Sequence, residues 1–200
     1  PVDAEIRSCP GWTLADLTRH LGGVHRWARS KLVGLSDAAD DPAPAEHTDL
    51  VAWFEEGADA IVTELRTRDA DASCWTLYPP AIAATWARRQ ALETAIHLWD
   101  ATDAIGQPTQ IPEDLAVSGV AEVVEDLYPR QVRLDRTAPL RSLTKIRVHG
   151  AAGERTSFSL GMPEASEGDR VIVELGAADA LLLLWKRRSL DELEVRVSGS

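Results

Sequence analysis

The strongest chemical signal in the sequence is the pair Glu93 and His97, which are four residues apart in a segment of helical periodicity. On an α-helix this spacing amounts to about 40° of rotation and about 6 Å of rise, so both side chains lie on one face. Apolar neighbours at Leu92, Ile96 and Trp99 place that face near an interior. A buried carboxylate is costly unless it is paired or binds a metal, and imidazole with carboxylate is a common ligand pair for divalent metals. The alternative is an ordinary contact between helix neighbours at a partly exposed surface.

A second histidine, His20, can complete such a metal site. It lies in an earlier helical segment among leucines and a valine, where a lone histidine is usually a hydrogen-bonded core residue. If the two helices are neighbours in a bundle, however, His20 can face Glu93 and His97. Two histidines and one glutamate leave a coordination position open for water or substrate, as in catalytic zinc sites.

The remaining histidines are weaker candidates. His25 follows five residues later, about 140° around the same helix, so it can reach the same ion only if the helix breaks at Gly22-Gly23. We expect it to be a pocket or surface residue. His47 lies in a polar loop and His149 on the charged face of a strand, so we expect both to be solvated.

Carboxylates and thiols near these segments have more than one interpretation. Asp16 and Asp100 could orient metal-bound imidazoles, although helix surfaces carry many carboxylates without such a role. Cys9 and Cys74 lack a neighbouring histidine or basic cluster that would lower a thiol pKa, so both are expected to be buried, inert thiols. Sequence motifs of serine hydrolases, P-loops and dinucleotide-binding folds are absent.

Two arginines near the end of the chain are candidates for binding an anion. Arg187 and Arg188 follow Trp185 and Lys186 at the end of a predicted helix. Cations there complement the helix dipole, which is the default interpretation. The alternative is that Arg187 or Arg188 binds an anionic group of a substrate.

Several elements must position these residues. Four segments have the apolar spacing of helices, over about 13–34, 48–67, 81–104 and 112–129. Thr13 and Asp16 suit the cap of the first helix, a loop is expected over 36–47, and the fourth helix is expected to stop near Pro129.

A different periodicity follows Pro139. Alternating apolar and polar residues predict strands over 145–149, 158–160, 170–175 and 193–197, with a turn at 150–154 and a helix over 178–187. The change near residue 135 predicts an α+β chain with two domains, a helical domain over 1–134 and a small α/β domain over 135–200.

Composition narrows the choice of partners and compartment. Of the 200 residues, 44% are hydrophobic, which is enough for a packed core, and the net charge of -11 disfavours nucleic acid and anionic membranes. No apolar run approaches the roughly 18 residues of a membrane span, and no signal peptide is recognised. Two distant cysteines indicate no disulfide framework and favour the cytoplasm.

Three segments together resemble the mycothiol-dependent maleylpyruvate isomerase family. Ser8 to Leu17, with its Cys-Pro-Gly-Trp sequence, and the following His20 to Trp27 are similar to the opening of these proteins. Glu93 to Asp100 resembles their second signature, and Leu181 to Val195 their C-terminal domain.

The resemblance implies a DinB-like antiparallel four-helix bundle followed by a small α/β domain like sterol carrier proteins. It implies that His20, Glu93 and His97 bind a divalent metal, usually zinc, and that a C-terminal arginine, matched here to Arg187 or Arg188, assists the isomerase. Family members usually have another helix before the segment that begins at Ser8, so we expect this bundle to lack its first helix.

The activity implied by the resemblance is metal-dependent activation of a low-molecular-weight thiol, mycothiol, for addition to an electrophile. The outcome would be cis-trans isomerisation, as with maleylpyruvate, or S-transfer. Two alternatives remain at this stage: a metal-dependent hydrolase or amidase that uses metal-bound water, and a non-enzymatic module that binds a small ligand. The expected partners are therefore a small thiol and an electrophilic substrate, with neither nucleic acid nor membrane.

Overall fold

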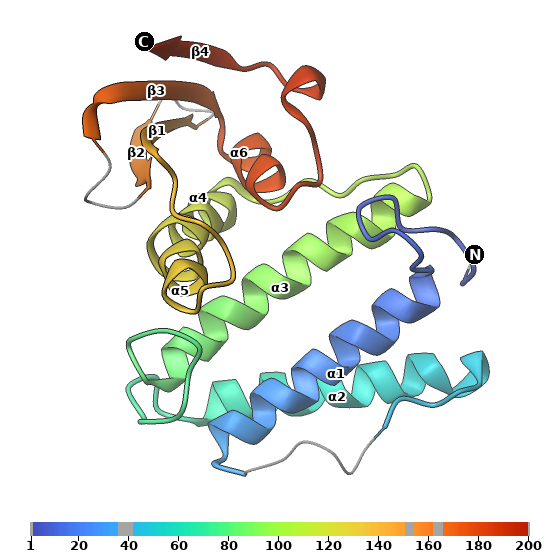
Figure 1. The fold of residues 1–200 in the computed structure, drawn as a ribbon. Coiled ribbons are helices and arrows are strands. Elements are labelled where there is room, and N and C mark those ends of the chain that lie inside the picture. Colours follow the sequence, from blue (N-terminus) through green and yellow to red (C-terminus); the bar gives the residue numbers. More distant parts are fainter. Residues whose placement is uncertain (1, 36–41, 151–153, 162–165, 200) are drawn as a thin grey trace. The chain divides into compact units, whose positions relative to one another are not determined.

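The computed structural model describes residues 2–35, 42–150, 154–161 and 166–199, which form two compact units, Pro1–Thr109 and Gln110–Ser200. Long helices make up the first unit, and the second combines a four-stranded sheet with shorter helices (Figure 1). The predicted α+β class is confirmed. Within the described ranges, no helix combines the length and apolar character needed to cross a membrane.

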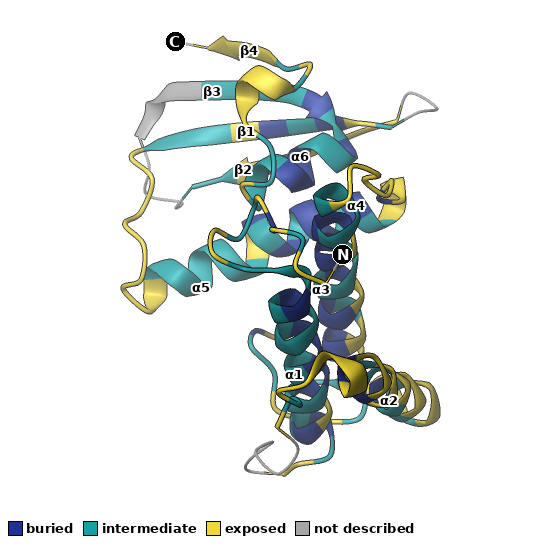
Figure 2. Cartoon of the chain, turned by 90° about the vertical axis from the view of Figure 1, so that its right-hand side faces the viewer, coloured by how far each residue is buried: buried dark blue, intermediate teal, exposed yellow. Residues whose placement is uncertain are grey.

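The first unit contains three long helices: α1 (Leu14–Leu32), α2 (His47–Thr67) and α3 (Ala83–Ala104). Helices α1 and α2 run in the same direction, and α3 returns antiparallel to both (Figure 1). A buried cluster shows this arrangement, because Ala28 and Ile61, late in α1 and α2, pack with Trp86, early in α3. Figure 2 shows buried residues along α1 and α3, whereas much of α2 is exposed. The antiparallel arrangement expected for the bundle therefore holds for α1 and α3, the helices that carry the predicted ligands.

Helix α1 begins with the predicted cap and continues without interruption. The backbone N–H of Asp16 donates to the Thr13 hydroxyl at 3.3 Å, and the Thr13 N–H donates to the Asp16 carboxylate at 2.9 Å. The helix does not break at Gly22 and Gly23. Gly22 instead lies so close to the ring of Trp53 in α2 that a Cβ atom there would overlap the ring. This glycine therefore serves the close approach of α1 and α2.

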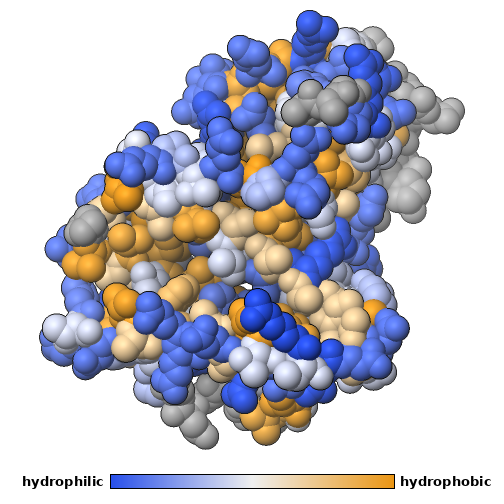
Figure 3. Space-filling model, turned by 180° about the vertical axis from the view of Figure 1, so that it is seen from behind, coloured by the Kyte–Doolittle hydropathy of each residue, from blue (hydrophilic) through white to orange (hydrophobic). Residues whose placement is uncertain are grey.

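The sheet of the second unit has the strand order β2-β1-β3-β4. Its strands are β1 (Ser142–His149), β2 (Arg155–Leu160), β3 (Ser166–Gly176) and β4 (Arg196–Gly199). Strand β1 pairs antiparallel with β2 and parallel with β3, and β4 is antiparallel to β3. Ile146 and Val148 alternate with polar residues and are buried, so one face of the sheet forms a core. Figure 3 shows hydrophobic side chains gathered over the helices, whereas hydrophilic ones prevail over the strands.

Helices α4 (Glu113–Ala121) and α6 (Ala177–Leu184) pack against each other in the second unit, and the short helix η2 (Leu190–Glu192) precedes β4. The predicted loop over 36–47 and turn over 150–154 fall partly outside the described residues, at 36–41 and 151–153.

The fourth predicted helix does not stop at Pro129. It continues from α4 through a π-helical segment, η1 (Glu122–Leu127), into α5 (Tyr128–Arg133). The N–H of Tyr128 donates to the carbonyl of Val123, five residues back, which is the pattern of a π-helix. This wider turn accommodates a proline that has no N–H for a regular α-helical hydrogen bond.

The division between the units also differs from the expected boundary at 134/135. It lies between Thr109 and Gln110, because α4 packs against α6 and thereby joins the core of the sheet unit. As described, the helical unit therefore holds three long helices. The change of period near residue 135 marks where helices give way to strands, and it carries no information about which core a helix joins.

Candidate metal centre

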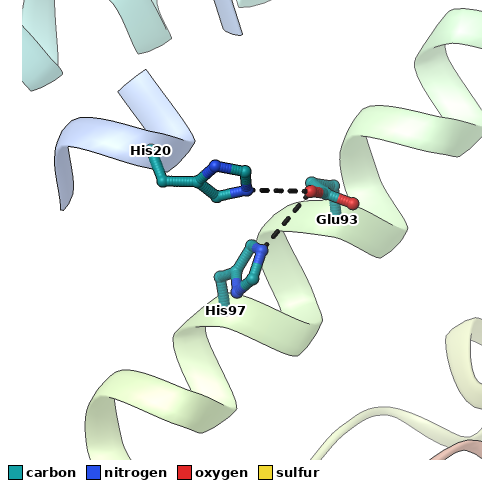
Figure 4. Close-up of side chains that lie close together, drawn as sticks. All are labelled: His20, Glu93 and His97. Carbon is teal, nitrogen blue, oxygen red and sulfur yellow. Dashed lines mark ion pairs between the residues drawn. The ribbon is translucent and has the colours of Figure 1, made fainter. Parts of the chain in front are cut away.

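Helices α1 and α3 bring the three predicted ligands together (Figure 4). The Nε2 atom of His20 lies 3.7 Å from Oε1 of Glu93, and the Nε2 atom of His97 lies 3.3 Å from the same oxygen. One ligand atom from each residue lies within 4.8 Å of the other two. Across the described ranges, these are the only three His, Cys, Asp or Glu side chains that cluster in this way.

The donor set fits a divalent metal. Around a tetrahedral zinc ion with bonds of about 2.1 Å, neighbouring ligand atoms lie about 3.4 Å apart. The separations of 3.7 and 3.3 Å from Glu93 to the two histidines are close to this value. Two imidazole nitrogens and one carboxylate oxygen are typical zinc ligands, and three protein ligands leave a fourth position for another molecule.

The three side chains differ in exposure. Those of His97 and Glu93 are 9% and 14% exposed, whereas that of His20 is 37% exposed, so solvent reaches the cluster at His20. Burial, with a smaller effect of the nearby His97, lowers the pKa of His20 from its ordinary value of 6.5. Neutral imidazole is the form that binds a metal, so His20 is available as a ligand at neutral pH.

Arg89 holds the carboxylate of Glu93. It lies one turn earlier on α3, is buried, and forms an ion pair with Oε2 of Glu93. The other carboxylate oxygen, Oε1, is the one that faces both histidines. The guanidinium thus compensates the buried negative charge and fixes the orientation of the carboxylate.

Asp100 holds His97 at Nδ1, the ring nitrogen that does not face Glu93. Its Nδ1 donates to Oδ2 of Asp100 at 2.9 Å, and the hydroxyl of Ser8 donates to Oδ1 of the same carboxylate at 2.6 Å. Asp100 is 1% exposed. With the proton on Nδ1, the lone pair of Nε2 points toward Glu93, as in carboxylate–histidine–metal arrangements. The role considered for Asp100 in the sequence therefore agrees with its geometry.

Trp12 lies against His20, the most exposed of the three side chains. Its ring centroid is 5.0 Å from that of His20, whose ring in turn meets His97 edge-on at 5.2 Å. Trp12 is partly buried and forms an apolar wall beside His20.

Other predicted residues lie away from the cluster. His25 contacts Thr94 at 3.2 Å and packs on Phe54, and it is 4% exposed, so it is neither a surface residue nor a fourth ligand. Asp16 caps α1 and pairs with Arg19, and these contacts account for its position.

The expected solvated histidines agree with the structure, whereas the expectation for the two thiols holds only in part. His47 and His149 are exposed. Cys9 and Cys74 are not joined in a disulfide, but both are only partly buried, so the expectation that they are buried was wrong. Partial burial raises the pKa of the Cys74 thiol. A raised pKa reduces the thiolate fraction, which agrees with a structural role.

Arg187 and Arg188 follow α6 in the second unit. One guanidinium nitrogen of Arg187 donates to the carbonyl of Trp185 at 2.9 Å, and the group lies 5.9 Å from the centroid of that indole ring. Arg188 donates to the carbonyl of Glu192 at 2.9 Å and pairs with Asp179 at 3.5 Å. These contacts lie within the second unit.

Ser8 and Arg89 are the partners that the sequence analysis did not assign. Ser8 is separated from Asp100 by 92 residues, and nothing in the sequence connects them. Arg89 precedes Glu93 by four residues, and this helical spacing could have indicated the ion pair.

The fold and the cluster define a class of two-unit proteins, with a His-Glu-His site between helices and a small α/β unit after it. Residues 1–102 match the profile of the mycothiol maleylpyruvate isomerase N-terminal domain, and residues 114–200 match that of the MDMPI C-terminal domain. The chain therefore belongs to the mycothiol maleylpyruvate isomerase family.

Two solved structures share the fold. One is a crystal structure of a histidine-to-alanine mutant of mycothiol-dependent maleylpyruvate isomerase, with a TM-score of 0.65 and 15% identity over 98% of this chain and 82% of that one. The other is described as mycothiol-dependent maleylpyruvate isomerase, with a TM-score of 0.61 and 16% identity over 100% of this chain and 82% of that one. A search of curated proteins gave no match.

Proposed function

We propose that the protein is an enzyme that binds one divalent metal ion, with zinc the best fit, through His20, Glu93 and His97, and that it uses mycothiol as a thiol cosubstrate. The observation that carries the proposal is the approach of the three ligand atoms to within 4.8 Å of one another. Membership of the family, and the activity named for the two structures of the same fold, support the choice of thiol.

The residues of the cluster have separate tasks in this proposal. A bound divalent metal lowers the pKa of a coordinating thiol and supplies a thiolate at neutral pH. Arg89 holds the Glu93 carboxylate, and Asp100 keeps His97 in the tautomer that presents Nε2. Trp12 excludes water from one side of His20.

The proposed reaction is reversible addition of the thiolate sulfur to a carbon–carbon double bond. With a cis-enoyl acid such as maleylpyruvate, a C–S bond forms, the former double bond becomes single, and rotation about it follows. Cleavage of the C–S bond then returns the thiolate and leaves the trans isomer. With an electrophile whose adduct does not eliminate, the S-conjugate is the product.

Arg187 or Arg188 is proposed to bind the substrate carboxylate or the developing enolate, a role that rests on the family resemblance. Arg187→Gln and Arg188→Gln would then separate the two candidates. The variant that loses the assisting group should lower kcat/KM for an anionic substrate while leaving the metal content unchanged.

The experiment is an assay of maleylpyruvate conversion with and without mycothiol, using wild-type protein, His20→Ala and His47→Ala. His47 is exposed and lies outside the cluster, so His47→Ala is the control. The proposal predicts thiol-dependent conversion by wild type and His47→Ala, and loss of conversion in His20→Ala. Turnover of amides or esters without any thiol dependence would favour a metal-dependent hydrolase. Metal retention with no thiol affinity and no turnover would favour a ligand-binding module.

A further inference from the structure

The outer face of the sheet gathers arginines from three strands. Arg147 on β1 is in register with Glu174 on β3, and Glu174 is in register with Arg196 on β4, so the three side chains form a row across the sheet. Arg155 on β2 pairs with His149 on β1, beside this row. Because side chains alternate along a strand, these residues lie on the face opposite to the buried Ile146 and Leu175.

These side chains line a hollow of about 520 Å³. It is bounded by the three arginines Arg147, Arg155 and Arg196, together with two glutamates, Glu174 and Glu194. Three guanidinium groups against two carboxylates leave one positive charge in excess. This excess occurs in a chain whose net charge is -11, so it is not an average property of the surface.

One arginine is already occupied by the central carboxylate. Arg147 donates to Oε1 of Glu174 at 2.8 Å. This hydrogen bond is the main reason why the pKa of Glu174 is lowered, and the charges of Arg155 and Arg196 act in the same direction, so both lie close to this carboxylate. Arg155 and Arg196 are exposed, and no side-chain hydrogen bond or ion pair joins either to another described residue.

We propose that this hollow binds a small molecule through one carboxylate or phosphate group, held by Arg155 and Arg196. A guanidinium presents a planar fork of donors that matches the oxygens of either group. Arg155 and Arg196 lie on the two edge strands, β2 and β4, and both side chains line the same hollow, so the two forks can hold one anion from opposite sides. Glu174 keeps Arg147 in place and prevents a larger accumulation of positive charge, which limits the site to a single anionic group. The inference is independent of the metal centre, which lies in the other unit.

The test uses the whole chain and two probes, inorganic phosphate and succinate, at constant ionic strength. Binding is followed through the backbone amide signals of the sheet in heteronuclear NMR spectra. The variants are Arg155→Gln and Arg196→Gln, with Arg141→Gln, an exposed arginine just before β1, as the matched control. Unchanged thermal melting and metal content in each variant show that the fold and the metal centre are intact.

We expect saturable shifts centred on residues 147, 155, 174 and 196 with phosphate, succinate or both, in wild type and in Arg141→Gln. Each of the other two variants should weaken binding about tenfold, the loss expected for one charge-assisted interaction. Arg196→Lys should bind more weakly than wild type and more tightly than Arg196→Gln. Absence of binding of both probes, or equal binding by all variants, overturns the proposal.

Discussion

Asp100 holds His97 at the ring nitrogen that faces away from Glu93. The hydrogen bond from Nδ1 measures 2.9 Å, and the two residues are three apart on α3. The position of the carboxylate is itself fixed by Ser8, in the segment before α1. The orientation of one proposed metal ligand thus depends on a fully buried carboxylate and on contact between distant parts of the chain.

Replacement of Asp100 by asparagine should weaken metal binding about 10- to 100-fold, the range found when such outer partners are removed. An amide has no negative charge to favour the Nδ1 proton and to increase the basicity of Nε2. The measurement is competition with a chromophoric chelator. Asp103→Asn is the control, because that carboxylate pairs with Arg7 instead of a histidine. Equal affinity of Asp100→Asn and wild type would show that Asp100 does not position His97.

The two adjacent glycines of α1 should respond in opposite directions to alanine. Gly22→Ala places a methyl group against the ring of Trp53, and such overpacking costs about 1–3 kcal/mol of unfolding free energy. Gly23→Ala meets no atom within 4 Å and should raise stability by about 0.5–1 kcal/mol through helix propensity. Urea denaturation of both variants measures the difference. Equal stabilities would mean that α1 and α2 are not in close contact at Gly22.

His25 should make the metal-free protein sensitive to mild acid. Burial is the main cause that lowers its pKa from 6.5 to about 4, so the unfolded chain takes up a proton at a higher pH than the folded one. The free energy of unfolding therefore carries no penalty from His25 above pH 6.5, where the imidazole is neutral in both states. It decreases by about 3 kcal/mol as the pH falls from 6.5 toward 4. Burial of His20 acts in the same direction.

The measurement is the free energy of unfolding between pH 7 and 4 in the presence of a chelator. His25→Gln should have a shallower dependence than wild type by about one proton. The exposed His47 provides the control, and His47→Gln should keep the wild-type dependence. An unchanged pH dependence in His25→Gln would exclude a buried, neutral His25.

The sequence predicted that His20, Glu93 and His97 lie together, because helix geometry is local. Four residues between Glu93 and His97 place them on one face, and only the pairing of two helices was needed to add His20. Ser8 could not be predicted, since its contact with Asp100 depends on how the segment before α1 folds back.

The end of the fourth helix and the unit that α4 joins could not be predicted from the sequence for a similar reason. Pro129 ends an ordinary α-helix, but the π-helical turn before it removes that restriction, and residue propensities do not reveal such a turn. The unit that α4 joins was also hidden, because its apolar face could have packed on either core and in fact packs on α6.

The metal content of the purified protein tests the central claim most directly, measured by elemental analysis beside His20→Ala, Glu93→Gln and His47→Ala. The account predicts about one equivalent of zinc or another divalent ion in wild type and in His47→Ala, and loss of that ion in the other two variants. Glu93→Gln keeps the size of the side chain beside Arg89, so its loss of metal would not be a consequence of a cavity. A folded wild-type protein that takes up no metal even after reconstitution would contradict the account.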